Sequence, residues 1–182
     1  MTAHSLATFV GNPVPQIVFA VFLVLAWPLS RLAGRDTGRR AVAALFLVSA
    51  GMIIALTATP SYTDPASYSA IPPHFLTELD QPRVIWAKLT AAPSDAEQIA
   101  NIALYVPLGI FGRLLWRSTA RATVCGFVMV LVIETVQYVI PGRAGSITDI
   151  RNNTLGAFLG AAAVSLVLLA QTERRPSVRR TR

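Results

Sequence analysis

The residues best suited to chemistry in this sequence are polar side chains set inside strongly apolar stretches. Glu134 and Gln137 lie three residues apart in one such stretch, so a helix would present both on one face. A carboxylate near the middle of a membrane helix costs at least about 2.5–3.5 kcal/mol on insertion scales and needs a hydrogen-bond donor or a countercharge. The polar residues that the chain can bring to the same depth are Asn101, Arg143, Asp149 and Asn153. We predict that these six residues form a ligand-binding site.

Two kinds of chemistry fit this set. In a binding site, Arg143 would pair with a phosphate or carboxylate of the ligand, the three amides would supply hydrogen bonds, and Glu134 would orient Arg143 or meet a cationic group. In an enzyme, Glu134 would act as general base on a lipid substrate. The binding site is favoured, because the one cysteine, Cys125, lies in the opposite half of its segment and no HExxH-type spacing occurs. The sequence predicts no metal or cofactor. A proton-coupled transporter that uses Glu134 is the third and weakest alternative.

The elements that must hold these residues are membrane helices. The chain has 182 residues, of which 53% are hydrophobic and 14% are charged, whereas soluble domains have about 25% charged residues. A bilayer core needs roughly 17–25 apolar residues of helix. Five segments approach or reach that length, which predicts an all-α integral membrane protein, a bundle of five transmembrane helices. The predicted spans are 14–29, 41–59, 99–116, 122–140 and 154–170.

The distribution of basic residues predicts how the bundle is oriented. Twelve of the sixteen lysines and arginines fall on one side, in the first and third connections, in the C-terminal tail and, for Arg113, at the adjoining end of the third span; four fall on the other side. By the positive-inside rule the N-terminus is outside and the C-terminus inside. Residues 1–13 are then an outer tail, 14–170 the membrane domain with an outer loop at 60–98, and 171–182 a basic cytoplasmic tail. Since no nucleic-acid motif accompanies these arginines, the expected partners are membrane lipids and not nucleic acid.

Helix-start signals refine two of these boundaries. Residues 94–97 and 146–149 both have a capping-box pattern, so the third helix is predicted to start near Asp95 and the fifth before Asp149. The 39-residue outer loop is too long for a simple connector. Its apolar residues at 75–79 and 84–89 are consistent either with short amphipathic helices at the membrane surface or with an ordinary packed loop.

The predicted topology brings the polar residues of three helices to the outer half of the membrane. On the fifth helix Asp149, Asn153, Gly156 and Gly160 fall in one stripe about 60° wide at 100° per residue. The two glycines form a GxxxG step that allows a neighbouring helix to come close. Pro107 is expected to bend the third helix, next to Gly109. A purely structural alternative remains, in which the polar residues only join three helices together.

These residues, in this order, resemble the VanZ-like family of bacterial membrane proteins, which takes its name from a teicoplanin-resistance accessory protein. The resemblance covers about residues 101–160 and rests on Asn101 with Pro107-Leu-Gly109, Glu134-Thr-Val-Gln137, Gly142-Arg143, and Asp149 followed by Asn153, Gly156 and Gly160. Family members often carry an acidic residue where Ser146 stands. The resemblance implies a multi-pass protein of the cytoplasmic membrane. It also implies a role in the cell envelope or in resistance to glycopeptide-type antibiotics. The ligand of the predicted site would then be a lipid-linked cell-wall precursor or a lipophilic antibiotic.

Overall fold

A computed structural model of the chain describes residues 11–60, 74–140 and 145–173, and the regular structure of these residues is helical. Five of the helices are long and apolar enough to cross a membrane, which confirms the predicted all-α, five-span fold. These five are α2 (Pro13–Ser30), α3 (Thr37–Thr57), α6 (Ala96–Trp116), α7 (Thr119–Val136) and α8 (Ile147–Glu173). The shorter helices are η1 (Arg31–Ala33), α4 (His74–Thr77), α5 (Pro82–Thr90) and η3 (Gln137–Val139).

Side-chain caps explain where the helices of the site begin. Asp95 is the N-cap of α6 and accepts a hydrogen bond from the backbone N–H of Gln98 at 2.8 Å, while the Gln98 amide reaches back to the Ser94 hydroxyl at 3.2 Å. This N–H bond holds the pKa of the Asp95 carboxyl below its ordinary value. α8 begins at Ile147, directly after Ser146. Both helix starts agree with the capping patterns in the sequence.

The end of α7 differs from the sequence prediction. The fourth span was expected to continue to Ile140, but α7 ends at Val136 and the chain tightens into η3. A 3₁₀ turn has three residues per turn instead of 3.6, so side chains beyond Val136 leave the face that a continuous α-helix would give them.

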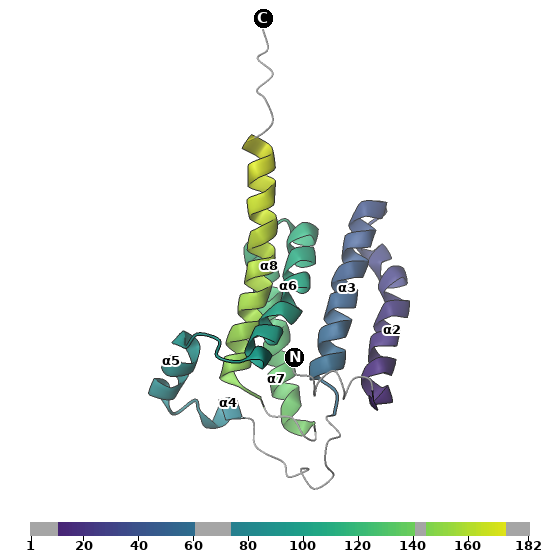
Figure 1. The fold of residues 1–182 in the computed structure, drawn as a ribbon. Helices are drawn as coiled ribbons and strands as arrows, with labels where there is room; N and C mark the ends of the chain where they lie inside the picture. Colours follow the sequence, from purple (N-terminus) through teal and green to yellow (C-terminus); the bar gives the residue numbers. More distant parts are fainter. Residues whose placement is uncertain (1–10, 61–73, 141–144, 174–182) are drawn as a thin grey trace, which may run out of the picture.

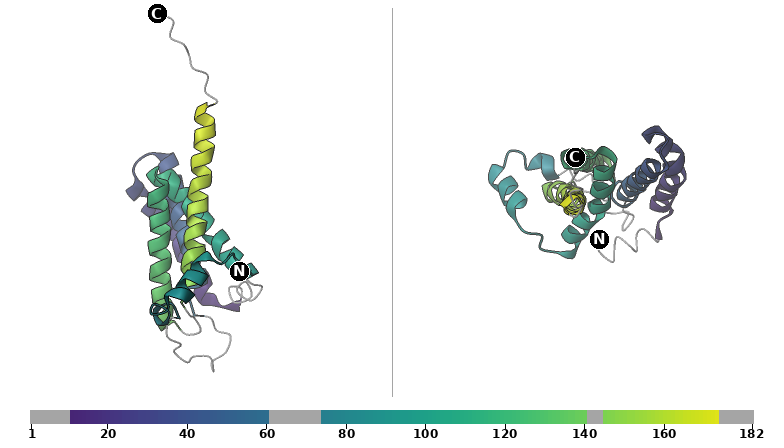
Figure 2. Two further views of the ribbon diagram at one scale, coloured as in Figure 1. Left: turned by 90° about the vertical axis from the view of Figure 1, so that its left-hand side faces the viewer. Right: turned by 90° about the horizontal axis from the view of Figure 1, so that it is seen from above.

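Three helices form the centre of the bundle. α8 packs along both α6 and α7, and α6 and α7 also contact each other. α3 packs against α6, and α2 packs against α3, so α2 is the outermost helix (Figures 1 and 2). With 27 residues, α8 is about 40 Å long at 1.5 Å per residue, and its C-terminal part extends beyond the other helices (Figure 1).

Glycines set the close approach of α6 and α8. A Cβ atom at Gly156 would overlap the carbonyl of Ile102, and one at Gly160 would overlap the carbonyl of Val106. In the other direction, a Cβ at Gly109 of α6 would overlap the carbonyl of Ala157. Each helix therefore presents glycine where the other helix's backbone comes closest, as in small-xxx-small contacts between membrane helices.

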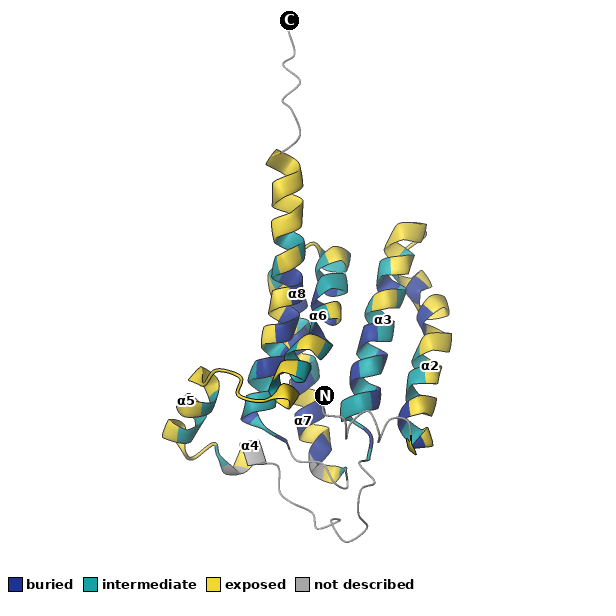
Figure 3. Ribbon diagram, in the orientation of Figure 1, coloured by how far each residue is buried: buried dark blue, intermediate teal, exposed yellow. Residues whose placement is uncertain are grey.

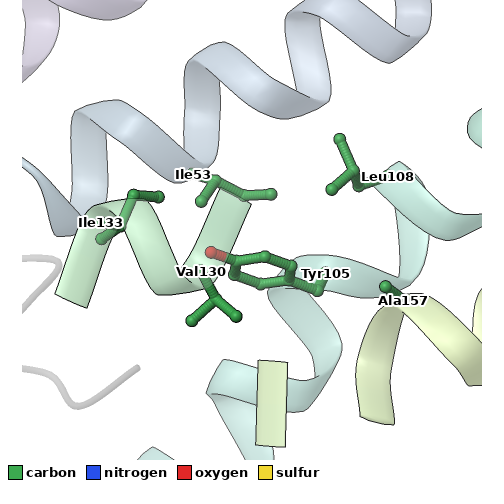
Figure 4. Packing of buried hydrophobic residues seen from close by; sticks show 6 residues of the cluster. All are labelled: Ile53, Tyr105, Leu108, Val130, Ile133 and Ala157. Atoms are coloured by element: carbon green, nitrogen blue, oxygen red, sulfur yellow. The ribbon is translucent and has the colours of Figure 1, made fainter. Parts of the chain in front are cut away.

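The buried core lies where α3, α6, α7 and α8 meet. Its members are Ile53, Tyr105, Leu108, Val130, Ile133 and Ala157 (Figure 4). Burial follows the helix faces that turn toward each other, and the outward faces are exposed (Figure 3). Large apolar side chains on these outward faces, such as Val24 at 72% and Leu166 at 67% exposure, suit contact with lipid.

The two described arginine-rich connections lie at the same end of the bundle. Arg31, Arg35, Arg39 and Arg40 lie in the connection from α2 to α3 and in the first turn of α3, and Arg117 and Arg121 lie between α6 and α7 and in the first turn of α7. Both connections are opposite to the end with α4 and α5 (Figure 1). The charge asymmetry is thus a property of the two ends of the bundle. The orientation in the membrane that we infer from it stays a prediction.

Candidate functional site

Asn101 and Asp149 join the second turn of α6 to the first turn of α8. The side-chain Nδ2 of Asn101 donates a hydrogen bond to Oδ1 of Asp149 at 2.8 Å, and both residues are half-buried. The sequence placed these two residues at one depth, and the structure brings them into direct contact. Only one carboxylate oxygen of Asp149, Oδ1, accepts a hydrogen bond from Asn101; the second oxygen, Oδ2, does not.

Glu134 secures the start of α8 from the end of α7. Its side chain is 2% exposed, and Oε2 accepts a hydrogen bond from the backbone N–H of Ser146 at 2.7 Å. A Cβ at Gly145 would lie 2.8 Å from the Glu134 carbonyl oxygen, so the approach to α8 packs tightly on α7. Glu134 therefore meets a backbone donor here, and this contact fixes one of its oxygens.

The other predicted residues do not all join this group. Gln137 is buried, but its Nε2 donates to the backbone carbonyl of Thr57 at 2.8 Å and so faces the C-terminal end of α3. This direction follows from the change to a 3₁₀ turn at Gln137. Asn153 is buried on α8, one turn after Asp149. Arg143 lies outside the described residues.

Three buried polar atoms beside these residues have no hydrogen-bond partner within the described part of the chain. They are the Tyr105 hydroxyl, the Asn152 Nδ2 and the Asn153 Oδ1, in side chains that are 0%, 0% and 3% exposed. The carboxylates of Glu134 and Asp149 both act electrostatically on the Tyr105 phenol, whose oxygen points toward α7 (Figure 4). An unsatisfied buried polar group costs about 1–3 kcal/mol, so native proteins contain few of them.

Tyr105 and Asn152 were not among the six predicted residues. Tyr105 follows Asn101 by four residues and so lies on the same face of α6, which is a signal that could have included it. The sequence favoured Asn153 over Asn152 because Asn153 shares the glycine stripe. The structure buries both side chains, and Oδ1 of Asn152 accepts hydrogen bonds from Arg151.

Arg151 is a second residue that the sequence did not assign to the site. The sequence counted it among the basic residues of the connection between the fourth and fifth spans, but it lies inside α8. Its guanidinium donates to Oδ1 of Asn152 at 3.0 and 2.8 Å, and to the backbone carbonyls of Lys88, at 2.5 Å, and Ala91. Arg151 therefore connects α8 to the end of α5 and places a cation beside the polar group.

We define the polar cluster as Asn101, Tyr105, Glu134, Asp149, Asn152 and Asn153. It offers two carboxylates, a phenol hydroxyl, an amide donor and an amide acceptor at one end of the α6–α7–α8 bundle. This mixture suits a ligand with hydroxyl, amide or ammonium groups. Among residues 11–60, 74–140 and 145–173, no three His, Cys, Asp or Glu side chains are placed to hold a metal ion.

Comparison with known proteins gives two matches. The model of a family described as VanZ/LLP1 matches residues 44–168, well over half of the chain. A stretch of 73 residues is 32% identical to Protein VanZ of Enterococcus faecium and covers 39% of this chain and 45% of that protein. The chain thus spans less than half the length of this relative. No solved structure matches the chain.

Proposed function

The chain belongs to the VanZ/LLP1 family, and on that basis we propose that it is a membrane protein of the bacterial envelope that protects the cell from glycopeptide-type antibiotics. In this proposal the polar cluster binds the head of an amphiphile, which is either a lipid-linked cell-wall precursor or a lipid-tailed antibiotic. The protein would act by binding and would make or break no bond. The membrane is the cytoplasmic membrane, and the cluster faces outward in the orientation predicted from the loop charges.

The observation that carries the proposal is the set of three unpartnered polar atoms in the cluster. Tyr105, Asn152 and Asn153 come from two helices and are almost fully buried, yet they lack partners among the described residues. Helix association alone would be served better by apolar side chains at these positions, because each unsatisfied group costs about 1–3 kcal/mol. A polar ligand that supplies their missing hydrogen bonds would remove this cost.

The two carboxylates have complementary roles in this proposal. Asp149 is oriented by Asn101, and Glu134 is oriented by the backbone N–H of Ser146. The remaining lone pairs of Asp149 would accept hydrogen bonds from hydroxyl or ammonium groups of the ligand. Arg143, predicted from the sequence, would pair with its phosphate or carboxylate. The engagement of Glu134 with a backbone amide favours a positioning role for this residue over that of a general base.

Antibiotic susceptibility of cells that express single variants tests the proposal. We would compare wild type, Tyr105→Phe and Asn153→Leu at matched membrane levels, with one lipid-tailed and one untailed glycopeptide as the drugs. Tyr105→Phe removes only an oxygen that bonds to no described residue, so it should not harm the fold. Thr135→Val is the control, because it removes an exposed α7 hydroxyl that bonds its own helix at Leu131.

The expected result is protection by wild type and by the control, with a clear loss in both cluster variants. Greater protection against the tailed drug would identify the antibiotic itself as the ligand. Equal protection against both drugs would favour a cell-wall precursor. Full protection by both cluster variants would contradict ligand binding and leave the cluster as a helix contact. If wild type fails to protect, the resistance role is wrong.

A further inference from the structure

A cavity at the arginine-rich end of the bundle lies far from the polar cluster. Its volume is about 560 Å³, and it lies between the start of α3 and the connection from α6 to α7. Arg39, Arg117, Arg121 and Asp36 contribute charged groups to its wall, and Trp116 and three aliphatic side chains contribute the apolar part. We call it the basic cavity.

The charges of the basic cavity are not balanced. Three guanidinium groups face one carboxylate, and Asp36 already accepts a hydrogen bond from the backbone N–H of Arg39 at 2.7 Å as the N-cap of α3. None of the three guanidiniums forms an ion pair or hydrogen bond with any residue that the structure describes. Like charges that converge on one cavity repel each other, so the cavity favours an anion such as a phosphate group, which guanidinium groups bind with short, charge-assisted hydrogen bonds.

The backbone at Arg117 adds a second observation. Arg117 is the C-cap of α6 and has a φ of 54°, the left-handed conformation that helix ends usually give to glycine. A side chain at such a position costs free energy relative to glycine. Arg117 adopts this conformation despite the cost, and it contributes a guanidinium to the wall of the basic cavity.

An apolar groove continues from the basic cavity toward the middle of the bundle. It has a volume of about 850 Å³ and runs between α3 and α7, which both pack on α6. The groove shares Trp116 and Arg121 with the basic cavity. Farther from the basic cavity, the lining of the groove is apolar and reaches Val128 and Met129 on α7. Eight residues of helix from Arg121 to Met129 span about 12 Å, enough for the upper part of an acyl chain.

We propose that the basic cavity and the groove together bind one anionic phospholipid. The headgroup phosphate lies between Arg39, Arg117 and Arg121, and one acyl chain follows the groove past Val124 and Val128. Trp116 lies at the junction, where the tryptophans of membrane proteins commonly meet the headgroup region. In the predicted orientation this lipid comes from the inner leaflet. The site is separate from the proposed antibiotic or precursor site, so either proposal can fail alone.

The positive-inside distribution alone would make all arginines at this end equivalent. The structure distinguishes them, because Arg31 and Arg35 lie at the same end with exposed side chains but do not line the cavity. They are therefore matched controls: their loss removes the same charge from the same end of the bundle. Val132 is a corresponding control for the groove, since it is exposed on α7 outside the groove lining.

The test measures binding of phosphatidylglycerol, phosphatidylcholine and inorganic phosphate to the purified full chain in a neutral detergent. Native mass spectrometry gives the occupancy as a function of lipid concentration. We expect wild type to bind phosphatidylglycerol at least about tenfold more tightly than phosphatidylcholine. Arg39→Gln and Arg117→Gly should each weaken phosphatidylglycerol binding about tenfold, and Arg31→Gln should change it less than about twofold. Arg117→Gly suits the left-handed backbone, so its loss of binding would not come from unfolding.

Val124→Trp tests the groove, because the larger side chain would fill it. Val132→Trp is its control, because Val132 lies outside the groove. We expect only Val124→Trp to weaken phosphatidylglycerol binding. If inorganic phosphate competes fully with the lipid and Val124→Trp has no effect, the site binds a free anion and the lipid proposal is wrong. It is also wrong if Arg31→Gln weakens binding as much as Arg39→Gln, or if phosphatidylcholine binds equally well.

Discussion

Tyr105→Phe is expected to stabilise the protein, which is an unusual result for a change in a buried core. The phenol is fully buried in the core of the bundle, and its oxygen has no partner in the described structure. Replacement by phenylalanine keeps the ring and removes only the unsatisfied oxygen. The cost of such a group is about 1–3 kcal/mol, so unfolding should become harder by about that amount. A change of 1 kcal/mol moves the unfolding midpoint of a chain of this size by about 2–4 °C.

The single cysteine offers a direct assay. Cys125 is half-buried in α7, so a thiol-reactive dye reports its exposure as the protein unfolds in detergent without added ligand. We expect the midpoint for Tyr105→Phe to lie at least about 2 °C above that of wild type. Ser165→Ala is the matched control, because the Ser165 hydroxyl is bonded to Arg113 and Thr119 at 2.8 Å each. That variant should lose about 1 kcal/mol and melt earlier.

A midpoint for Tyr105→Phe below that of wild type would refute this reasoning, since it would mean that the hydroxyl has a partner in the folded protein. Tyr105→Ala should change the stability in the opposite direction. It removes the ring as well as the oxygen and leaves a cavity in the cluster of Figure 4, which should cost about 3–5 kcal/mol.

Three further predictions follow from other parts of the fold. Gly160→Leu should destabilise the bundle by about 1–3 kcal/mol in the same assay, because its side chain must enter the backbone of α6, whereas Gly38→Ala, with only an ordinary contact at 3.4 Å, should be neutral. The N-cap hydrogen bond of Asp95 needs the ionised carboxylate, and the pKa of this carboxyl is lowered in the folded protein. The stability that the cap contributes is therefore present above the ordinary carboxyl pKa and is lost as the pH falls through the lowered pKa. Hydrogen exchange of the first turn of α6 should accelerate over that range in wild type, and in Asp95→Asn it should not change there. In a chain with Cys125→Ala, a cysteine at the exposed Ala92 should react with an impermeant reagent from outside the cell and one at Arg35 should not; the reverse pattern would overturn the predicted orientation.

Much of the fold could be predicted because each membrane span is encoded locally. An apolar run of about 20 residues is by itself enough to indicate a helix in lipid, where every backbone polar group must be satisfied within the segment. The starts of α6 and α8 were also predictable, since a cap involves only residues three or four positions apart. The end of α7 was not, because the sequence stays mostly apolar up to Ile140, apart from Gln137, and gives no sign of the 3₁₀ turn.

The polar cluster was predictable only in part. The depth of Asn101, Glu134 and Asp149 follows from counting residues along each helix, and the structure places Asn101 against Asp149. The rotation of each helix about its axis does not follow from counting. Gln137 therefore faces Thr57, and Tyr105 enters the cluster without having been assigned to it.

Hydropathy and charge in the sequence alone determine that this chain is a five-span membrane protein, and the ordered motifs from Asn101 to Gly160 identify its family. The tertiary structure alone decides which side chains meet. Gly109, Gly156 and Gly160 let α6 and α8 approach until their backbones touch, and this contact sets the rotation of both helices. That rotation turns Tyr105, Asn152 and Asn153 inward, because a helix packed through one narrow stripe must bury whatever lies beside the stripe.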